Sequence, residues 1–332
     1  MCATSTSSRP PEVRNTSSPA LRLTTMRASL PAAPGGAALP STGMGQDHPD
    51  SPAHPDSPAP PGGPAHPGGP RGPAAPGRRG GPDDPDFPAR TAPRAPSLDR
   101  LDAAVVRCRA CPRLVEWRER VGREGRRAYA GWDYWARPVP GFGPDDAALL
   151  VVGLAPAAHG GNRTGRMFTG DRSGDVLYAA LHRLGLAGQA EATSRDDGLR
   201  LHGVRVTAPV HCAPPDNRPT PAERDTCRPW LARELDLLRP TVRALVVLGA
   251  FGWQAVLPAL AAAGWSVPRP RPRFAHGARV RLPAAGGGPD LELFGCYHVS
   301  QRNTFTGRLT PDMLTDVLGA AARAAGLPAA TP

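Results

Sequence analysis

Four short apolar runs after residue 140 predict buried β-strands. They span residues 147–154, 204–209, 242–248 and 291–299. Their length and their content of Val, Leu and Ala favour strands over helices. Apolar residues largely follow one another in these runs instead of alternating with polar ones, so we expect strands that are buried on both faces.

Stretches with helical periodicity surround these runs. Ser97 is a suitable N-cap for a helix that carries Leu98, Leu101 and Val105 toward Cys108. Further helices are expected at residues 112–120, 174–184, 221–238, 251–263 and 311–324. Strands that alternate with helices predict an α/β fold with a parallel sheet covered on both faces. Residues 129–143 and 269–273 are expected to form loops.

Polar, glycine-rich segments come just after each predicted strand. They cover residues 153–171, 209–217, 249–252 and 298–308. The carboxyl ends of parallel strands share one edge of a sheet, and ligands bind at that edge in α/β folds. We therefore expect these four segments to converge on one cleft.

The first 97 residues differ in composition from the rest of the chain. They hold 22 of the 43 prolines and one aromatic residue, Phe87. Such a segment buries too little apolar surface to offset the entropy of ordering it. We expect a disordered tail at residues 1–97, one domain at residues 98–326 and a disordered C-terminus at residues 327–332.

The positive charge of the chain comes entirely from arginine. The net charge is +11, and the sequence contains no lysine. A lysine Schiff base and a standard P-loop are therefore excluded. Residues 98–332 carry 31 Arg against 22 Asp and Glu, an excess that suits a polyanionic partner without specifying one.

The sequence shows neither a membrane span nor a signal peptide. No apolar run approaches the roughly 18 residues that a span needs, and Pro and Gly interrupt every apolar stretch near the N-terminus. We expect a cytoplasmic protein without a membrane partner. In that compartment cysteines are thiols or metal ligands rather than disulfides.

Six cysteines fall into pairs and single residues. Cys108 and Cys111 form a C-x2-C pair, and Cys212 and Cys227 form a C-x14-C pair. Close pairs are typical of metal sites, although scattered buried thiols would give the same sequence. Cys296 lies in a predicted strand and is expected to pack there, and Cys2 lies in the tail.

Two of the glycine-rich segments carry candidate site chemistry. The segment GLAPAAHGGNRTGRMFTGD, residues 153–171, would let its backbone approach a ligand, but it could equally be a loop whose Asp171 caps the next helix. The segment HVSQRNTFTGRLT, residues 298–310, mixes a histidine, hydroxyls and arginines of the kind that contact phosphates. The alternative is a polar loop with a satisfied histidine.

Three segments together carry a resemblance. GLAPAAHGGNRTGRMFTGD, HCAPPDNRPTP and YHVSQRNTFTGRLT, in this order and with the four paired cysteines around them, resemble the signature segments of the family 5 (type b) uracil-DNA glycosylases. The resemblance covers roughly residues 98–326. It implies a central four-stranded parallel sheet flanked by helices. It also implies a 4Fe–4S cluster on Cys108, Cys111, Cys212 and Cys227, with zinc as the second choice of metal.

The resemblance assigns roles in the hydrolysis of the bond between a damaged base and deoxyribose. It implies that Asp171 is the carboxylate beside the sugar and that His298 donates to a carbonyl oxygen of the leaving base. It further implies that Asn217 positions water or the base and that the flipped base stacks on Phe168. The base pocket would also include Gly153, Ala155 and His159.

The same resemblance implies contacts to DNA. Residues 300–308 resemble a loop that enters the duplex, with phosphate and groove contacts from Ser300, Arg302, Asn303 and Thr304. Arg163 and Arg166 are expected to add to that surface. The implied partner is double- or single-stranded DNA that contains uracil or other deaminated bases such as hypoxanthine, bound by a monomer in base excision repair. Without a lysine, the enzyme is expected to be monofunctional.

Two other functions fit parts of the sequence. A non-catalytic module that binds damaged DNA would keep the arginines and the cysteines without needing Asp171. A nucleotide hydrolase could use the glycine-rich loop. The missing lysine and the lack of a second acidic cluster for Mg²⁺ count against the hydrolase.

Overall fold

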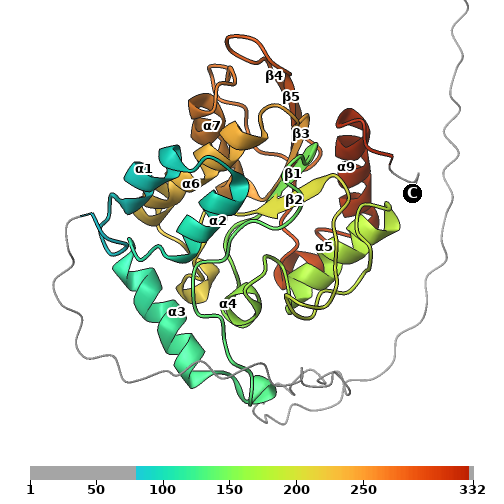
Figure 1. The fold of residues 1–332 in the computed structure, drawn as a ribbon. Coiled ribbons are helices and arrows are strands. Elements are labelled where there is room, and N and C mark those ends of the chain that lie inside the picture. The colour runs from blue at the N-terminus through green and yellow to red at the C-terminus, as the bar shows by residue number, and fades with distance from the viewer. Residues whose placement is uncertain (1–79, 329–332) are drawn as a thin grey trace, which may run out of the picture. The chain divides into compact units, whose positions relative to one another are not determined.

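The structure is a computed structural model, and it describes residues 80–328. The predictions for residues 1–79 and 329–332 fall outside this range. A five-stranded sheet forms the centre of the described part, in the order β2-β1-β3-β5-β4 (Figure 1). The strands are β1 Leu149–Val152, β2 Val204–Thr207, β3 Ala244–Leu248, β4 Arg279–Leu282 and β5 Leu291–Cys296.

The four predicted strands are present, and they are parallel to their neighbours. Every residue of β1, β2 and β3 is buried, which explains their continuous apolar sequences. The prediction missed β4, an antiparallel strand at the edge of the sheet. Its sequence RVRL contains no apolar run. The two arginines are exposed at the edge of the sheet, where apolar residues are not required.

Six helices occur where periodicity predicted them. They are α2 Leu98–Val106, α3 Pro112–Glu124, α5 Arg172–Arg183, α6 Pro221–Leu238, α7 Ala250–Ala262 and α9 Pro311–Ala324. Short elements occupy segments expected to be irregular. They are α1 Phe87–Thr91, α4 Gly161–Thr164, α8 Gln301–Phe305, and the 3-10 turns η1 Ala92–Arg94, η2 Arg127–Tyr129 and η3 Pro215–Asn217. Ser97 caps α2 as expected, since its side chain accepts from the backbone N–H of Arg100.

Helices cover the sheet on both faces. Along β1, Leu150 and Val152 join a core that includes residues of α2, α6 and α7. The alternate residues Leu149 and Val151 join a second core with residues of α5 and α9. Figure 1 shows these two groups of helices on opposite sides of the strands. The sheet therefore holds the loops at its carboxyl edge between two packed layers.

The expected domain boundary at residue 97 is wrong. The Phe87 side chain is 7% exposed and packs edge-on against Trp230 of α6, with 5.9 Å between ring centroids. Ala92 is fully buried, and the Arg233 guanidinium donates to the carbonyl of Ala95. Residues 80–97 thus belong to the folded domain. At the other end, Leu327 packs beside the second core, so residue 326 is not the limit either.

Within residues 80–328, no helix combines the length and the apolar content needed to cross a membrane.

Candidate active site

A cleft of about 760 Å³ lies where the parallel strands end. Its walls come from the segments that follow four different strands, together with Arg126 and Tyr129. The segments contribute residues 154–160 and 167–173 after β1, Asn217 after β2, residues 248–251 after β3, and His298 with residues 300–302 after β5. The predicted convergence on one cleft is confirmed.

Asp171 is both a helix cap and a member of the cleft. Its Oδ1 accepts hydrogen bonds from the backbone N–H groups of Ser173 at 2.9 Å and Gly174 at 3.1 Å, at the start of α5. Burial is the largest influence on this carboxyl and raises its pKa, against the effect of the two N–H donors. The capping interpretation and the cleft interpretation therefore hold together, because only one oxygen is used by the cap.

Gly160 leaves the second carboxylate oxygen its space. A Cβ atom at position 160 would stand 1.9 Å from Oδ2 of Asp171. No side chain can therefore occupy this position while the carboxylate keeps its place. The missing side chain leaves room for the carboxylate of Asp171, which is a lining residue of the cleft.

Phe168 forms an aromatic wall of the cleft. Its backbone has φ 51°, in the left-handed region that non-glycine residues rarely adopt. Its ring lies against Gly153, where a Cβ would stand 2.6 Å from the ring edge. The His298 ring is tilted by 33° to it, with 6.4 Å between centroids. The sequence thus brings the predicted base-stacking residue beside the predicted base donor.

His298 enters the cleft as a neutral side chain. Burial alone lowers its pKa to about 4. Its ring makes no hydrogen bond within residues 80–328. Its carbonyl accepts from the side-chain amide of Asn303 at 2.8 Å, which fixes the backbone at the end of β5. A neutral imidazole with free ring nitrogens can donate one hydrogen bond to a ligand.

Asn217 and His159 complete the predicted set on the other walls. Asn217 is exposed at the end of η3 with φ 53°, a conformation that Asn tolerates better than most residues. His159 is held from outside the cleft, since its Nδ1 lies 3.1 Å from the hydroxyl of Tyr134. Burial lowers the pKa of His159, and nearby Arg126 and Arg163 add to that effect. Ala155 lines the cleft as well.

The prediction that Arg163 contacts DNA is wrong, because the side chain is only 4% exposed. Its guanidinium donates to the carbonyls of His159 at 2.8 Å and Gly170 at 2.9 Å. It also lies 3.9 Å and 4.2 Å from the ring centroids of Tyr129 and Trp132. Arg163 therefore links the backbone at His159 to the backbone at Gly170 within the glycine-rich segment 153–171.

Arg166 is also buried and does not reach the surface. Its guanidinium pairs with both carboxylate oxygens of Asp197, at 2.8 and 2.6 Å. The expectation that it extends a DNA-binding surface is therefore wrong.

The loop after β5 places only some of its predicted contacts on the cleft. Ser300 and Arg302 line it. Asn303 braces His298, and the Thr304 hydroxyl donates to carbonyls of its own helix, α8. The loop ends in Phe305, which is 67% exposed and is the large hydrophobic side chain left exposed among the described residues.

Sequence reasoning missed three further residues at the mouth of the cleft. Arg126, Tyr129 and Arg172 all contribute to its lining. The guanidinium of Arg172 lies 5.7 Å from the ring centroid of Phe305, which connects α5 to the loop after β5. The aromatic content of residues 129–143 was the available signal for Tyr129.

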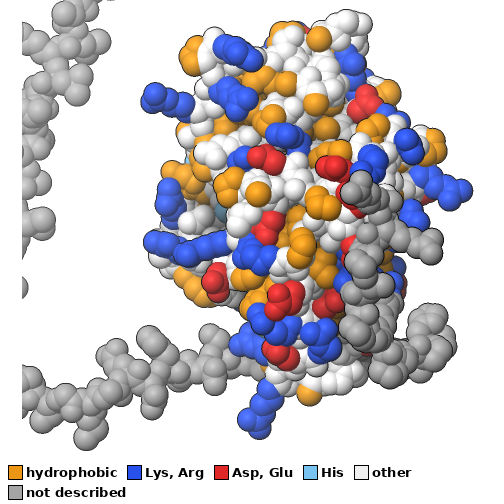
Figure 2. Space-filling view, turned by 90° about the vertical axis from the view of Figure 1, so that its left-hand side faces the viewer, with side chains coloured by type: hydrophobic (Ala, Val, Ile, Leu, Met, Phe, Trp, Pro, Cys, Tyr) orange, Lys and Arg blue, Asp and Glu red, His pale blue; other side chains and the backbone are white. Residues whose placement is uncertain are grey.

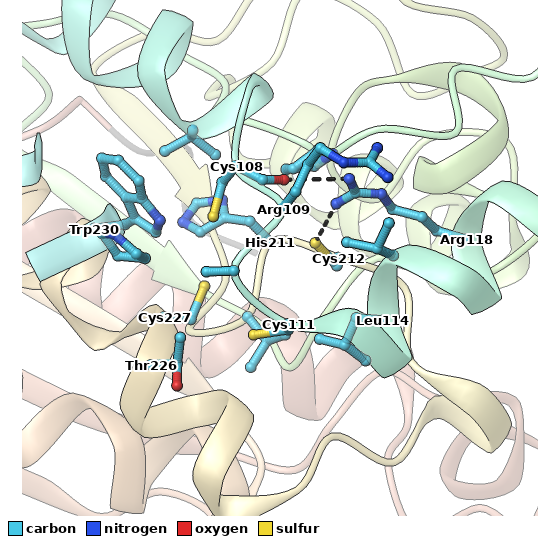
Figure 3. A pocket seen from close by; sticks show the side chains of 16 residues that line it. Cys108, Arg109, Cys111, Leu114, Arg118, His211, Cys212, Thr226, Cys227 and Trp230 are labelled. Atoms are coloured by element: carbon cyan, nitrogen blue, oxygen red, sulfur yellow. Dashed lines mark hydrogen bonds between the residues drawn. The ribbon is translucent and has the colours of Figure 1, made fainter. Parts of the chain in front are cut away.

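A second hollow contains the four paired cysteines (Figure 3). Cys108 and Cys111 lie between α2 and α3, Cys212 follows β2, and Cys227 is on α6. Burial is the largest influence on each thiol. It raises the pKa of Cys108 to about 11 and that of Cys111 to about 12, and it also raises the pKa of the other two. Cys296 is fully buried in β5, as predicted, and is not part of this hollow.

Polar nitrogen atoms without partners line the same hollow. Arg118 Nη1 donates to the sulfur of Cys212 at 2.8 Å, but its Nε has no acceptor. Trp230 Nε1 and His211 Nε2 also lack hydrogen-bond partners. Among the described residues, no group of three or more His, Cys, Asp or Glu side chains is gathered closely enough to hold one metal ion. The four thiols thus line one hollow, although they come from segments that are far apart in the sequence.

Comparison with known families identifies a match to the central part of the chain. The family model of the uracil DNA glycosylase superfamily matches residues 140–321. This range includes the five strands and every element that lines the cleft except the segment with Arg126 and Tyr129.

Individual relatives extend the similarity in the N-terminal direction. The chain is 55% identical over 233 residues to the type-5 uracil-DNA glycosylase of Mycobacterium tuberculosis, which covers 70% of this chain and 84% of the relative. It is 52% identical over 224 residues to the protein of the same name from Thermus thermophilus, covering 67% and 96%. For Pyrobaculum aerophilum the identity is 48% over 222 residues, covering 67% and 91%.

Proposed function

The chain belongs to the type-5 uracil-DNA glycosylases of the uracil DNA glycosylase superfamily, and on that basis we propose that it excises uracil from DNA in base excision repair. The reaction hydrolyses the N-glycosidic bond. Water supplies the oxygen that replaces the base at the sugar carbon, and the base leaves with the bonding electrons. Positive charge develops on the sugar and negative charge on the base, so the site needs opposite chemistry on its two sides.

One observation carries the proposal: Asp171, whose second carboxylate oxygen is not used by the helix cap, lines a cleft that also holds a neutral histidine. Asp171 Oδ2 occupies the space that Gly160 leaves open. There it would stabilise the positive sugar and accept a proton from the attacking water, a role that a raised pKa favours. The non-catalytic alternative gives no reason for this cleared space.

His298 would act on the base. Because its pKa is lowered to about 4, it is neutral at ordinary pH and donates without delivering a full charge. A donor of this kind stabilises the negative charge that develops on a base carbonyl. The Phe168 ring beside it offers a face on which the flipped base can stack. Asn217 would help to hold the water or the base.

A stacking face suits more than one base, since every base has a π-face. We therefore extend the proposal to hypoxanthine and other deaminated bases. The same reasoning allows double- or single-stranded DNA as the substrate.

The loop after β5 would open the duplex. Ser300 and Arg302 line the cleft and are suited to phosphate contacts. Phe305, exposed at the end of α8, would fill the gap that the flipped nucleotide leaves in the stack. Among the described residues, the Arg172 guanidinium lies 5.7 Å from the ring centroid of Phe305.

We further propose that the cysteine hollow holds a 4Fe–4S cluster rather than zinc. Cys108, Cys111, Cys212 and Cys227 would bind it, because all four line one hollow. The unpartnered nitrogen atoms of Arg118 and Trp230 would find acceptors in cluster sulfur. The cluster would tie the segment between α2 and α3 to α6 and to the loop after β2.

We further propose that the enzyme is active as a monomer and works in the cytoplasm. The test is an excision assay on end-labelled duplexes that carry one uracil or one hypoxanthine. The proposal predicts strand cleavage only after alkali, and no adduct trapped by borohydride, because the chain has no lysine. Binding without alkali-labile sites would favour the non-catalytic alternative.

A further inference from the structure

An arginine-rich segment runs along the outer edge of the sheet into β4. From Arg271 to Arg281 exposed residues alternate strictly with partly buried ones. Alternate side chains of an extended chain point to the same side. Arg271 and Arg273 are exposed before a turn at residues 276–277, and Arg279 and Arg281 are exposed after it, in β4. Arg269 is exposed two residues before Arg271.

The inward side of this segment is fixed to the domain. The Trp253 indole donates to the carbonyl of Pro272 at 2.8 Å. Phe274 packs edge-on against the Trp253 ring, with 5.9 Å between centroids. His276 stacks on Tyr297 at 4.9 Å and accepts its backbone N–H at 3.2 Å. The outward arginines are thus presented by a backbone that packing holds in place.

The segment that precedes β4 lies on the cleft side of the sheet. Because β4 is antiparallel to β5, its first residue, Arg279, lies near the end of β5 that leads to His298. Tyr297, which His276 contacts, immediately precedes His298. Trp253 belongs to the first turn of α7, whose neighbour Phe251 lines the cleft. Residues 271–276 therefore run beside the cleft.

The charges along the segment differ between its two ends. Arg279 and Arg281 pair with Glu292 and Asp290 of the neighbouring chain segment. Arg269, Arg271 and Arg273 make no ion pair or hydrogen bond within residues 80–328. The free positive charge is therefore concentrated at the end beside the cleft.

The opposite situation holds on the face that carries α1, α3 and α6, where Figure 2 shows basic and acidic side chains side by side. There Arg113 pairs with Glu223, and Arg233 pairs with Asp236. Unpaired arginines also occur elsewhere within residues 80–328, so what distinguishes Arg269, Arg271 and Arg273 is that they follow one another at alternate positions beside the cleft.

We propose that Arg269, Arg271 and Arg273 form a second contact to the DNA backbone, on the duplex that flanks the damaged nucleotide. This inference rests on the proposed function, since it takes DNA as the partner. Alternate residues of an extended chain are ~6–7 Å apart, so the guanidiniums of Arg271 and Arg273 can meet neighbouring phosphates of one strand. Arg269 precedes them across a bend at residues 269–270 and adds a third positive charge to the same stretch. Contacts to phosphate raise affinity and its salt dependence but read no base and touch no reacting atom.

The test compares two variants of the full chain. One carries R269Q, R271Q and R273Q. The other carries R279Q and R281Q, which removes the two exposed arginines of β4 that are held in ion pairs. The measurement is the dissociation constant of a uracil-free duplex by fluorescence anisotropy at several salt concentrations, together with the single-turnover rate of uracil excision at saturating enzyme.

In the first variant, the slope of log association constant against log salt concentration should become less steep by about 2–3, because each lost phosphate contact removes about 0.9 from its magnitude. Its excision rate at saturation should stay within about twofold of that of the unsubstituted protein. The second variant should keep the slope. Equal loss per arginine in both variants, or an unchanged slope in the first, would overturn the inference. Failure of the unsubstituted protein to excise uracil would instead overturn the proposed function.

Discussion

The cleft and the cysteine hollow are lined by different residues from interleaved parts of the chain, and they differ in how their polar groups are held. In the cleft, Asp171 is held by two N–H donors and His159 by Tyr134, so its groups have their positions without a ligand. In the hollow, nitrogen atoms of Arg118 and Trp230 are buried without partners. Unpaired buried polar atoms destabilise a fold. On the proposed assignments, the cleft acts on a substrate, whereas the hollow takes a bound group that supplies partners to these nitrogen atoms.

Removing one cysteine from the hollow should have the largest effect. Cys227→Ser should greatly reduce the yield of soluble protein, its iron content and its brown colour, because the cluster loses a ligand and the surrounding segments lose their tie. The matched control is Cys296→Ala, which removes a buried thiol outside the hollow. Iron and zinc contents are measured by metal analysis of both proteins. A colourless protein with one bound zinc and no iron would contradict the cluster assignment.

Adding one methyl group to the cleft should have the next largest effect. In Gly160→Ala the new Cβ would meet Oδ2 of Asp171 and displace the carboxylate. Single-turnover excision of uracil should fall by roughly 10² or more, since preorganised charge is lost, while duplex affinity persists.

The control for Gly160→Ala is Gly188→Ala, where the nearest atom would be an ordinary 3.7 Å away. If Gly160→Ala excised uracil at the normal rate, the carboxylate oxygen would have no need of the space that Gly160 leaves.

A smaller effect is expected at the exposed end of the loop after β5. Phe305→Ala should slow excision from a duplex by about tenfold and leave excision from single-stranded DNA nearly unchanged, because opening the stack costs a few kcal/mol only in a duplex. The measurement is the ratio of the two single-turnover rates. Equal slowing on both substrates would show that Phe305 does not act on the stack.

The smallest effect is expected in the pH dependence of the excision rate, which should distinguish Asp171 from His298. Protonation of Asp171, whose pKa is raised by burial, should produce one acidic limb in the excision rate, absent in Asp171→Asn. His298, with its pKa lowered to about 4, should produce no limb near 6.5. Because unfolded histidine titrates near 6.5, the stability that this residue contributes is complete above 6.5. It is lost as the pH falls toward 4. A limb near 6.5 that disappears in His298→Gln would contradict the assignment of a neutral donor.

The sequence predicted what local patterns encode. Helix α6 begins and ends where it was predicted, because Thr220, Pro221 and Glu223 form a capping box with proline in the first turn. The cleft could be predicted because strand order alone brings the ends of parallel strands to one edge. Phe87 was missed because one aromatic residue in a proline-rich stretch does not change its average composition.

The surroundings of other residues depend on tertiary contacts, which the sequence alone could not predict. Arg163 was expected at the surface as a cation, yet two carbonyls and two aromatic rings surround it. No pattern around residue 163 indicates those partners, which come from the fold. Strand β4 was missed for a similar reason, since an edge strand with outward arginines has no apolar run.

The rate of uracil excision by Asp171→Asn tests the central claim most directly. Asparagine keeps the size of the side chain and can still cap α5, so the melting temperature and the duplex affinity should be retained. The matched control is Asp312→Asn, an exposed acidic residue in the first turn of α9. The account predicts that Asp171→Asn excises uracil and hypoxanthine at least roughly 10²-fold more slowly in single turnover, with the control unchanged. A rate within a few-fold of that of the unsubstituted protein would contradict it.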